Sequence, residues 1–395
     1  MKNRVIIQLF IGYLISGIGF SLFNSTYILL MTDQKGFNDS QTSIIVGLTA
    51  LAVLPTSLLW GTFIDRSKKL MKFSKISLVG TIIFTILLLF SNNFYLFFLI
   101  YIMRTIAVQP YFSLLSEYTI DKASQMDIRY GVVLSSLSLG WGLAGIIGLF
   151  FMNYIGITGM LYLSVVLLII QLLILNTLPE YTTKINYNNN EQIKLISNLK
   201  LLFKNKKFIY FLFIYTLLIS TSGSSTGYGT SSLLIKLNTP QNIITLVPFT
   251  LIIFEIFTIS NIEKFSFFKK TYVSLFLAAS ILVVRWLIMA ITSSYMLVMA
   301  SLLLHGFSQG ILSPLITANV VTMVEERQRS TALLLNSLLQ TLFVAIINLL
   351  LGQFVPYFGI STYGSLYLII ALICSVFIVS KIKSNKYQKL SVDEF

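Results

Sequence analysis

The stretch EYTTKINYNNNEQIKLISNLKLLFKNKK, residues 180–207, is the longest polar segment of a 395-residue chain that is otherwise strongly apolar. Hydrophobic residues make up 56% of the sequence and charged residues 11%, whereas a soluble domain carries about 25% charged residues. A core of ordinary size cannot bury this much apolar surface, so we expect lipid to be the solvent. The apolar runs on either side are long and continuous, which predicts membrane-spanning helices and not the short alternating strands of a barrel.

This polar stretch divides twelve predicted spans into two sets of six. The predicted fold class is therefore an all-α membrane protein with twelve transmembrane helices in two pseudo-symmetric halves. We predict an N-terminal six-helix bundle over 1–180, a cytoplasmic linker over 181–207, and a C-terminal bundle over 208–395 that ends in a short cytoplasmic tail. The predicted spans are 5–30, 41–63, 75–91, 94–116, 131–153, 158–178, 208–234, 241–260, 271–291, 295–318, 330–353 and 362–381.

Basic residues predict the orientation of these spans. The formal net charge is +14, and lysine and arginine gather in alternate loops, the first of which contains the N-terminus. The opposite loops carry only Lys35 and Lys236, while Arg104 and Arg285 lie inside spans. We therefore expect a protein of the cell (cytoplasmic) membrane with both termini in the cytoplasm. The excess charge indicates topology and contact with anionic membrane lipids, and no nucleic-acid partner is expected.

Residue types that carry enzyme chemistry are scarce. Cys374 is the only cysteine and lies in an apolar run, so neither an intrachain disulfide nor a cysteine metal site is expected. His305 is the only histidine, and the chain has no GxxxxGK[ST] nucleotide-binding loop. We predict no enzyme activity, no metal and no cofactor.

The two halves echo each other in their charged residues. Arg104 is followed 25 residues later by Arg129, and His305 is followed 24 residues later by Arg329. Many transporters are built from such repeats, with the substrate site near the midplane between them.

The segment GTFIDRSKKL, residues 61–70, closes the second predicted span. With twelve spans around it, this segment resembles the signature loop of the major facilitator superfamily. The resemblance implies a latch of the cytoplasmic gate in the outward-facing state. A basic loop that merely follows the positive-inside rule is the alternative interpretation. The residues assigned to the predicted gate are Gly61, Asp65, Arg66, Lys68, Lys69, Glu117 and Arg129.

Two further segments resemble motifs of the same family. LIYIMRTIAVQP (99–110) is similar to the fourth-span motif, whose arginine corresponds to Arg104. GVVLSSLSLGWGLAGIIGL (131–149) follows the spacing of the exporter motif, although small residues also let helices pack closely. Within the family, the chain most resembles the sugar efflux transporters and the lactose-permease-like group.

Few charges lie deep inside the predicted spans, where a charge is expensive and functional by default. The lactose-permease-like group has a glutamate in span 8, an arginine in span 9 and a histidine in span 10, which Glu255, Arg285 and His305 resemble. Ser308 stands where that group has a second carboxylate, so its full proton relay is not implied. We predict these three residues as the proton-coupling group, with Glu255 as the proton carrier.

Structural roles are the alternatives. Glu255 would then pair with Arg285, and His305 would form a hydrogen bond between helices. Arg104 is the first candidate for substrate binding, and it too has a structural alternative, a bond to a backbone carbonyl. Weaker candidates, each of which can instead join helices by hydrogen bonds, are Asn24, Tyr228, Asn336 and Gln340.

These observations predict a monomeric secondary transporter that works by proton-coupled alternating access. We expect it to export a small polar or amphipathic solute, such as a sugar-like compound or a drug. Proton-coupled uptake of a sugar or nucleoside is the alternative. A membrane sensor or scaffold that does not transport is the alternative from another class. The partners expected are the small-molecule substrate, protons and membrane lipids.

Overall fold

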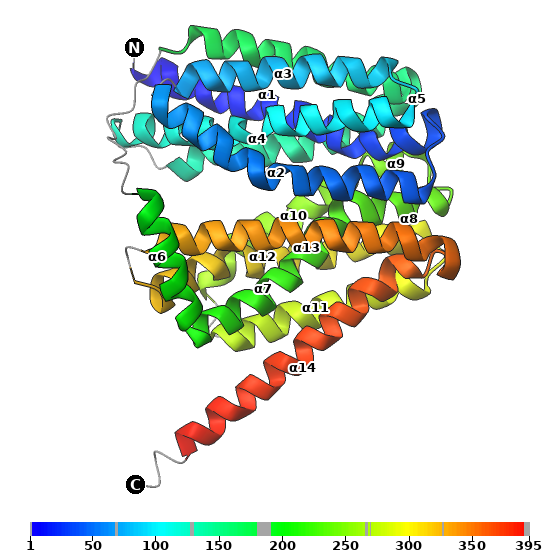
Figure 1. Ribbon diagram of the computed structural model, residues 1–395. Coiled ribbons are helices and arrows are strands. Elements are labelled where there is room, and N and C mark those ends of the chain that lie inside the picture. The colour runs from blue at the N-terminus through cyan, green and yellow to red at the C-terminus, as the bar shows by residue number, and fades with distance from the viewer. Residues whose placement is uncertain are drawn as a thin grey trace. The chain divides into compact units, whose positions relative to one another are not determined.

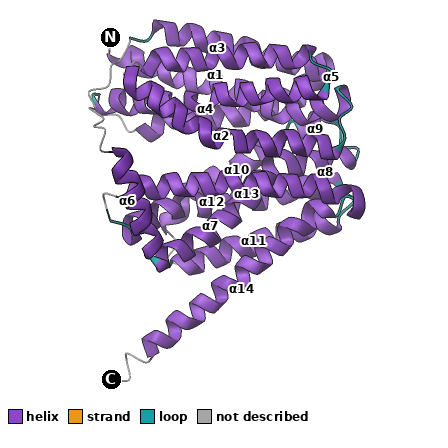
Figure 2. Ribbon diagram, in the orientation of Figure 1, coloured by secondary structure: helices purple, strands orange, loops and turns teal. Residues whose placement is uncertain are grey.

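The structure is a computed structural model that describes residues 2–67, 70–126, 130–179, 191–264, 268, 270–325 and 328–390. Within these ranges every regular element is a helix (Figures 1 and 2). Ten segments of the described residues are long and apolar enough to cross a membrane. The prediction of an all-α, multi-pass membrane protein is confirmed, since helices of this length satisfy their own backbone polar groups in lipid.

The first six predicted spans fall on the first five long helices. Gly156 has φ 65° and ψ −176° inside α5, a left-handed conformation that separates two spans within one continuous run. The break predicted between residues 153 and 158 is therefore confirmed. The elements are α1 Lys2–Leu29, the π-helix η1 Leu30–Gln34, α2 Asp39–Ser67, α3 Leu70–Phe90, α4 Phe94–Ser124 and α5 Tyr130–Thr177.

The remaining spans follow α6 Glu191–Lys204, a helix within the stretch predicted as a linker. A π-turn interrupts the seventh span, and a short turn interrupts the eighth. The elements are α7 Lys206–Ser224, the π-helix η2 Ser225–Gly229, α8 Thr230–Lys236, α9 Gln241–Ile244, α10 Val247–Asn261, the 3-10 turn η3 Ile262–Lys264, α11 Thr271–Ile291, α12 Tyr295–Met323, α13 Arg329–Phe358 and α14 Thr362–Leu390.

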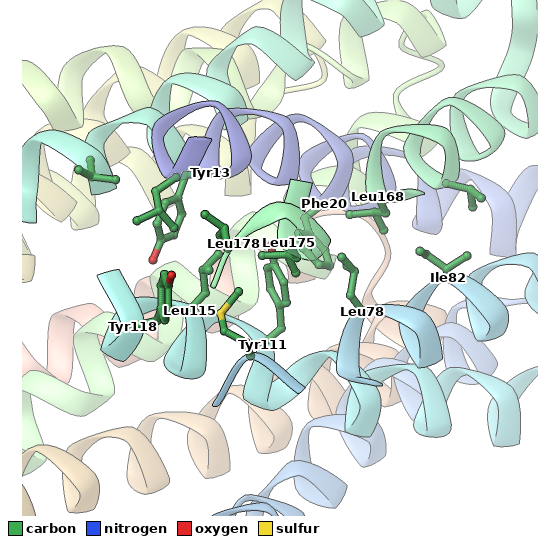
Figure 3. Close-up of a cluster of buried hydrophobic side chains, with 14 residues drawn as sticks. Tyr13, Phe20, Leu78, Ile82, Tyr111, Leu115, Tyr118, Leu168, Leu175 and Leu178 are labelled. Carbon is green, nitrogen blue, oxygen red and sulfur yellow. The ribbon is translucent and has the colours of Figure 1, made fainter. Parts of the chain in front are cut away.

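These helices form two compact units. Unit 1 comprises Met1–Tyr187 with Asn238–Ile252, and unit 2 comprises Asn188–Leu237 with Ile253–Phe395. In unit 1, buried aromatic and aliphatic side chains from α1, α3, α4 and α5 form a core, seen in Figure 3 around Tyr111 and Leu175. The Tyr111 hydroxyl accepts a hydrogen bond from Gln171 Nε2 at 2.8 Å, so the polar atom of this buried ring has a partner.

Helices α1 and α5 pack through glycines. A Cβ at Gly17 would lie 2.5 Å from the Leu137 carbonyl oxygen, and one at Gly140 would meet the backbone of Leu14. Such close approach without side chains is how helices associate in lipid, where apolar burial gives no net driving force. Ser164 Oγ adds a hydrogen bond to the Gly19 carbonyl at 2.7 Å.

The segment Asn238–Ile252 also packs on α5 within unit 1. A Cβ at Gly145 would lie 2.9 Å from Phe249 Cβ, and one at Gly148 would overlap the side chain of Thr245. Gly145 and Gly148, two of the glycines in the exporter-like spacing, therefore let Asn238–Ile252 pack closely against α5.

Lys35 closes one end of unit 1, just after the first span. Its ammonium group donates hydrogen bonds to the Leu89 carbonyl at 2.8 Å and to Asn92 Oδ1 at 2.7 Å, so it ties the end of α1 to the last turn of α3. Burial lowers the pKa of Lys35, because desolvation disfavours its charged form. A structural role thus accounts for one of the two basic residues in the loops that otherwise lack lysine and arginine.

Candidate functional site

The seventh span carries the small polar run STSGSSTGYGTSS, residues 220–232, and it changes from α7 to the π-helix η2 within this run. A π-turn bonds residue i to residue i+5, as the Thr230 amide does to the Ser225 carbonyl. The wide turn aligns the two side chains, whose hydroxyl oxygens lie 3.0 Å apart. Ser225 and Thr230 therefore present two adjacent acceptors to whatever faces this turn.

Arg285 of α11 faces them and is fully buried. Its Nη2 donates to Ser225 Oγ at 2.9 Å and to Thr230 Oγ1 at 3.3 Å, and its Cζ lies 4.0 Å from the centre of the Trp286 ring. Its Nε has no hydrogen-bond partner among the described residues. No described carboxylate forms an ion pair with it. The cation is thus held by neutral groups, and its Nε donor is unused among the described residues.

His305 of α12 completes the contact. Arg285 Nη1 lies 2.7 Å from His305 Nδ1, and Ser222 Oγ lies 3.5 Å from the same nitrogen. Since a guanidinium group only donates, Nδ1 must accept, and the proton of the imidazole is then on Nε2. The structure brings together two of the three predicted proton-coupling residues, with the histidine in its neutral form.

A second layer surrounds this pair. Ser224 Oγ donates to Asn348 Oδ1 and lies 3.0 Å from the Tyr367 hydroxyl. The Tyr367 ring packs on Trp286 with 4.7 Å between centroids. Predicted residue Tyr228 is buried beside Tyr363, with centroids 6.3 Å apart. The polar cluster of unit 2, comprising Arg285, His305, Ser225, Thr230 and this layer, draws side chains from α7, η2, α8, α11, α12, α13 and α14.

Glu255 of α10 is half-buried and makes neither an ion pair nor a side-chain hydrogen bond with the described residues. The packing of α10 on α12 passes beside it, because a Cβ at Gly310 would lie 3.1 Å from the Glu255 carbonyl oxygen. The alternative interpretation of Glu255 as the ion-pair partner of Arg285 receives no support from this geometry.

Arg104 lies in a separate cluster in unit 1. Its Nε donates to Thr85 Oγ1 at 2.9 Å, and its Cζ lies 3.2 Å from the centre of the Phe23 ring. Phe23 and Tyr27 stack with centroids 5.8 Å apart, and Tyr27 stacks on Tyr101 at 5.9 Å. The ring of Phe23 thus faces the guanidinium group of Arg104, in the place of an ion-pair partner. Cation–π attraction stabilises the buried charge in this arrangement.

The other weaker substrate candidates lie on α1 and α13. Asn24 is exposed on α1. Asn336 is buried on α13, and its Oδ1 has no partner among the described residues. Gln340 is half-buried, and its backbone carbonyl accepts from Ser220 Oγ at 3.2 Å.

The predicted gate falls mostly outside the described part of the chain. Lys68, Lys69 and Arg129 are not among the described residues, and of Gly61, Asp65 and Arg66 only the helical backbone within α2 is described. Glu117 is exposed on α4. The gate assignment stays a prediction.

Sequence reasoning missed several side chains that hold the two buried arginines. The run of small polar residues in the seventh span was a signal for Ser225 and Thr230, because a lipid-facing segment has no use for so many hydroxyl groups. For Phe23, Thr85 and Trp286 no such signal exists, since their residue types are common in membrane helices.

Two buried cations held by aromatic and hydroxyl groups within a polytopic helical protein define the class as a membrane protein with internal polar sites, as found in carriers. The sequence matches the Major Facilitator Superfamily over residues 9–266, and the chain belongs to this family. No curated protein matches the chain.

Solved structures of transporters share the fold. A variant of the nucleoside transporter NupG has a TM-score of 0.81 at 16% identity, over 96% of this chain and 99% of that one. A D-xylose-proton symporter has a TM-score of 0.71 at 14% identity, over 94% and 97% of the two chains. A POT family transporter in complex with a thioalcohol-conjugated peptide reaches 0.73 at 13%, over 97% and 96%. The family and these neighbours point to a transporter and not to an enzyme.

Proposed function

We propose that the protein is a proton-coupled transporter of a small polar or amphipathic solute, working by alternating access. The contact between Arg285 and His305 carries the proposal. A buried cation that has neutral partners and an unused Nε donor is costly to keep in a membrane protein. The unused donor gains a function if a hydroxyl or carboxylate group of the solute accepts a hydrogen bond from Arg285 Nε during the transport cycle.

Glu255 is the proposed proton carrier. Protonation of His305 at Nδ1 would set an N–H against an arginine N–H, so Arg285 would first have to withdraw. The Glu255 carboxylate has no such obstacle, because none of the described residues bonds to it. A membrane carboxylate without a fixed partner can be neutral in one state and charged in another, which is what a coupling site requires.

The test uses purified protein in proteoliposomes with an imposed pH gradient and a panel of sugars, nucleosides and cationic drugs. Glu255→Gln mimics the protonated carboxyl group. It should abolish accumulation driven by the gradient while sparing solute exchange. His305→Gln keeps an acceptor of similar reach and should slow transport without removing its dependence on the gradient. Glu325→Gln, which removes an acid outside the predicted spans, is the matched control.

If Glu255→Gln still accumulates solute through the proton gradient and His305→Gln does not, the two roles are reversed. If no solute moves under any gradient, although the wild-type protein is folded, the proposal of transport is wrong. The alternative of a membrane sensor would then gain support.

Export is the proposed direction, because residues 131–149 follow the spacing of the exporter motif. The second candidate is uptake by symport of a sugar or nucleoside, and fold similarity to NupG and to the D-xylose-proton symporter favours it. Solute uptake into everted vesicles with an acidic interior distinguishes export by antiport from uptake by symport. A proton antiporter would load solute into them as protons leave, and a symporter would not.

A further inference from the structure

A pocket of about 770 Å³ opens at the end of unit 1 that contains the first turns of α1. The last turns of α4 and α5 form its other walls. Arg4 and Lys122 supply positive charge, and Gln8 and Gln125 supply amide groups. No acidic residue is among the described residues that line it.

The basic side of the pocket is ordered by its own hydrogen bonds. Lys122 Nζ donates to Gln125 Oε1 at 3.2 Å, and Gln125 Nε2 donates to Asp121 Oδ2 at 2.6 Å. Asp121 lies 3.8 Å from Lys122 Nζ but outside the lining, so it positions the ammonium group without facing the pocket. Arg4 is exposed on α1. Two cations on separate helices thus face one space, which is the arrangement that binds a phosphate.

An apolar groove of about 280 Å³ continues from this pocket. Both spaces are bounded by Gln8 and Thr177, and Gln8 Nε2 donates to Thr177 Oγ1 at 3.0 Å where they meet. Beyond this bond the walls are aliphatic, and Ile11 and Leu173 are 42% and 60% exposed.

The basic pocket and the apolar groove form one continuous strip, because the residues that line them are spaced along single faces of α1 and α5. Arg4, Gln8 and Ile11 follow one another at intervals of four and three residues, which places them along one face of α1. Thr177, Leu173 and neighbouring isoleucines do the same along the second span of α5. The strip is charged at the end of the helices and apolar toward the middle of the spans.

We propose that this strip is a binding site for one anionic phospholipid. Its phosphate lies between Arg4 and Lys122, and one acyl chain lies along Ile11 and Leu173. The charge of the pocket selects an anionic headgroup. A free phosphate would leave the adjoining aliphatic groove unused, so the shape of the strip selects a lipid. The site is independent of the transport pathway proposed above.

The experiment measures lipid binding by native mass spectrometry of the purified full-length protein in detergent. The ligands are phosphatidylglycerol, phosphatidylcholine with the same acyl chains, and glycerol 3-phosphate. The headgroup variant is Arg4→Gln with Lys122→Gln, and its control, Lys207→Gln, removes an exposed lysine of unit 2. The groove variant is Leu173→Ser, and its control is Leu372→Ser, at a residue that is 46% exposed on α14.

Wild-type protein should prefer phosphatidylglycerol to phosphatidylcholine. Because each surface cation contributes roughly fivefold to affinity for an anionic lipid, the headgroup variant should bind phosphatidylglycerol about 25-fold more weakly and lose the preference. Leu173→Ser should weaken both lipids, and the two controls should bind as wild type does.

Equal binding of phosphatidylglycerol by the wild type and the headgroup variant would overturn the proposal. So would binding of glycerol 3-phosphate as tight as that of the lipid, since the site would then be a plain anion site. The melting temperature of each variant without added lipid shows whether it is folded. If the headgroup variant does not fold, the test is the comparison of lipid binding by Leu173→Ser with lipid binding by its control, Leu372→Ser. Equal lipid binding by these two variants would overturn the proposal.

Discussion

Arg285 Nη1 and His305 Nδ1 lie 2.7 Å apart, and this hydrogen bond joins α11 to α12 inside unit 2. The bond fixes the chemistry of both partners. The arginine is a permanent donor, so the histidine is an acceptor and neutral for as long as the contact lasts. Any state in which His305 is protonated at Nδ1 must therefore be one in which α11 and α12 present these side chains differently.

The first prediction concerns that acceptor. His305→Phe keeps an aromatic ring of similar size but leaves Arg285 Nη1 buried without a partner, which should lower the free energy of unfolding by about 1–3 kcal/mol. His305→Gln retains an acceptor and should lose less. Thermal unfolding in detergent measures both. A phenylalanine variant as stable as the glutamine variant would show that the bond contributes little.

The second prediction concerns the arginine of unit 1. Thr85 Oγ1 accepts from Arg104 Nε and donates to the Thr81 carbonyl at 2.7 Å. Thr85→Val keeps the shape and removes both bonds, so it should lower unfolding free energy by about 1–3 kcal/mol. Thr341→Val is the control, because among the described residues the hydroxyl of the half-buried Thr341 bonds only to the Ser337 carbonyl of its own helix. Equal loss in the two variants would argue against a special role for the Arg104 contact.

The spans could be predicted because the signal is local: a long apolar run must be a helix in lipid, whatever surrounds it. Arg285 and His305 also stood out locally, as ionisable groups in apolar runs. Their contact could not be predicted, because it depends on how α11 and α12 are rotated about their own axes, which composition does not determine.

Asn24 and Phe23 illustrate the same limit. Sequence reasoning favoured the polar residue, yet the ring of Phe23 faces Arg104 and Asn24 is exposed. Adjacent residues point about 100° apart around a helix, so an error of one position changes the face. The π-turn at Ser225–Gly229 adds a rotation that the residue types of this segment do not reveal.

The third prediction is the orientation of the chain. Ser293, two residues past the end of α11, and Lys204, the last residue of α6, are exposed. Cys374 is buried and should give little background labelling. In intact cells, a membrane-impermeant maleimide should label Ser293→Cys directly and Lys204→Cys only after permeabilisation, because basic loops stay in the cytoplasm. Labelling of both from outside would contradict the predicted topology.

The last prediction asks whether the glycines of α5 matter because they allow close packing or because they belong to the exporter-like spacing. Gly148→Ala would push a methyl group into Thr245, which is fully buried, and should cost about 1–3 kcal/mol of unfolding free energy. Gly131 belongs to the same exporter-like spacing, but a Cβ there meets no atom of the described residues within 4 Å. Because Gly131 is exposed in the first turn of α5, Gly131→Ala should leave the free energy of unfolding unchanged to within about 0.5 kcal/mol.

Combining Gly148→Ala with Thr245→Gly makes the test specific to this contact. The second change removes the side chain that the new methyl group would meet, so the double variant should lose less than the sum of the two single losses, with a coupling energy of about 1 kcal/mol or more. Additive losses would show that the cost of Gly148→Ala arises elsewhere. If Gly131→Ala lowered the free energy of unfolding as much as Gly148→Ala does, the glycine spacing itself would matter beyond the close contact of Gly148 with Thr245.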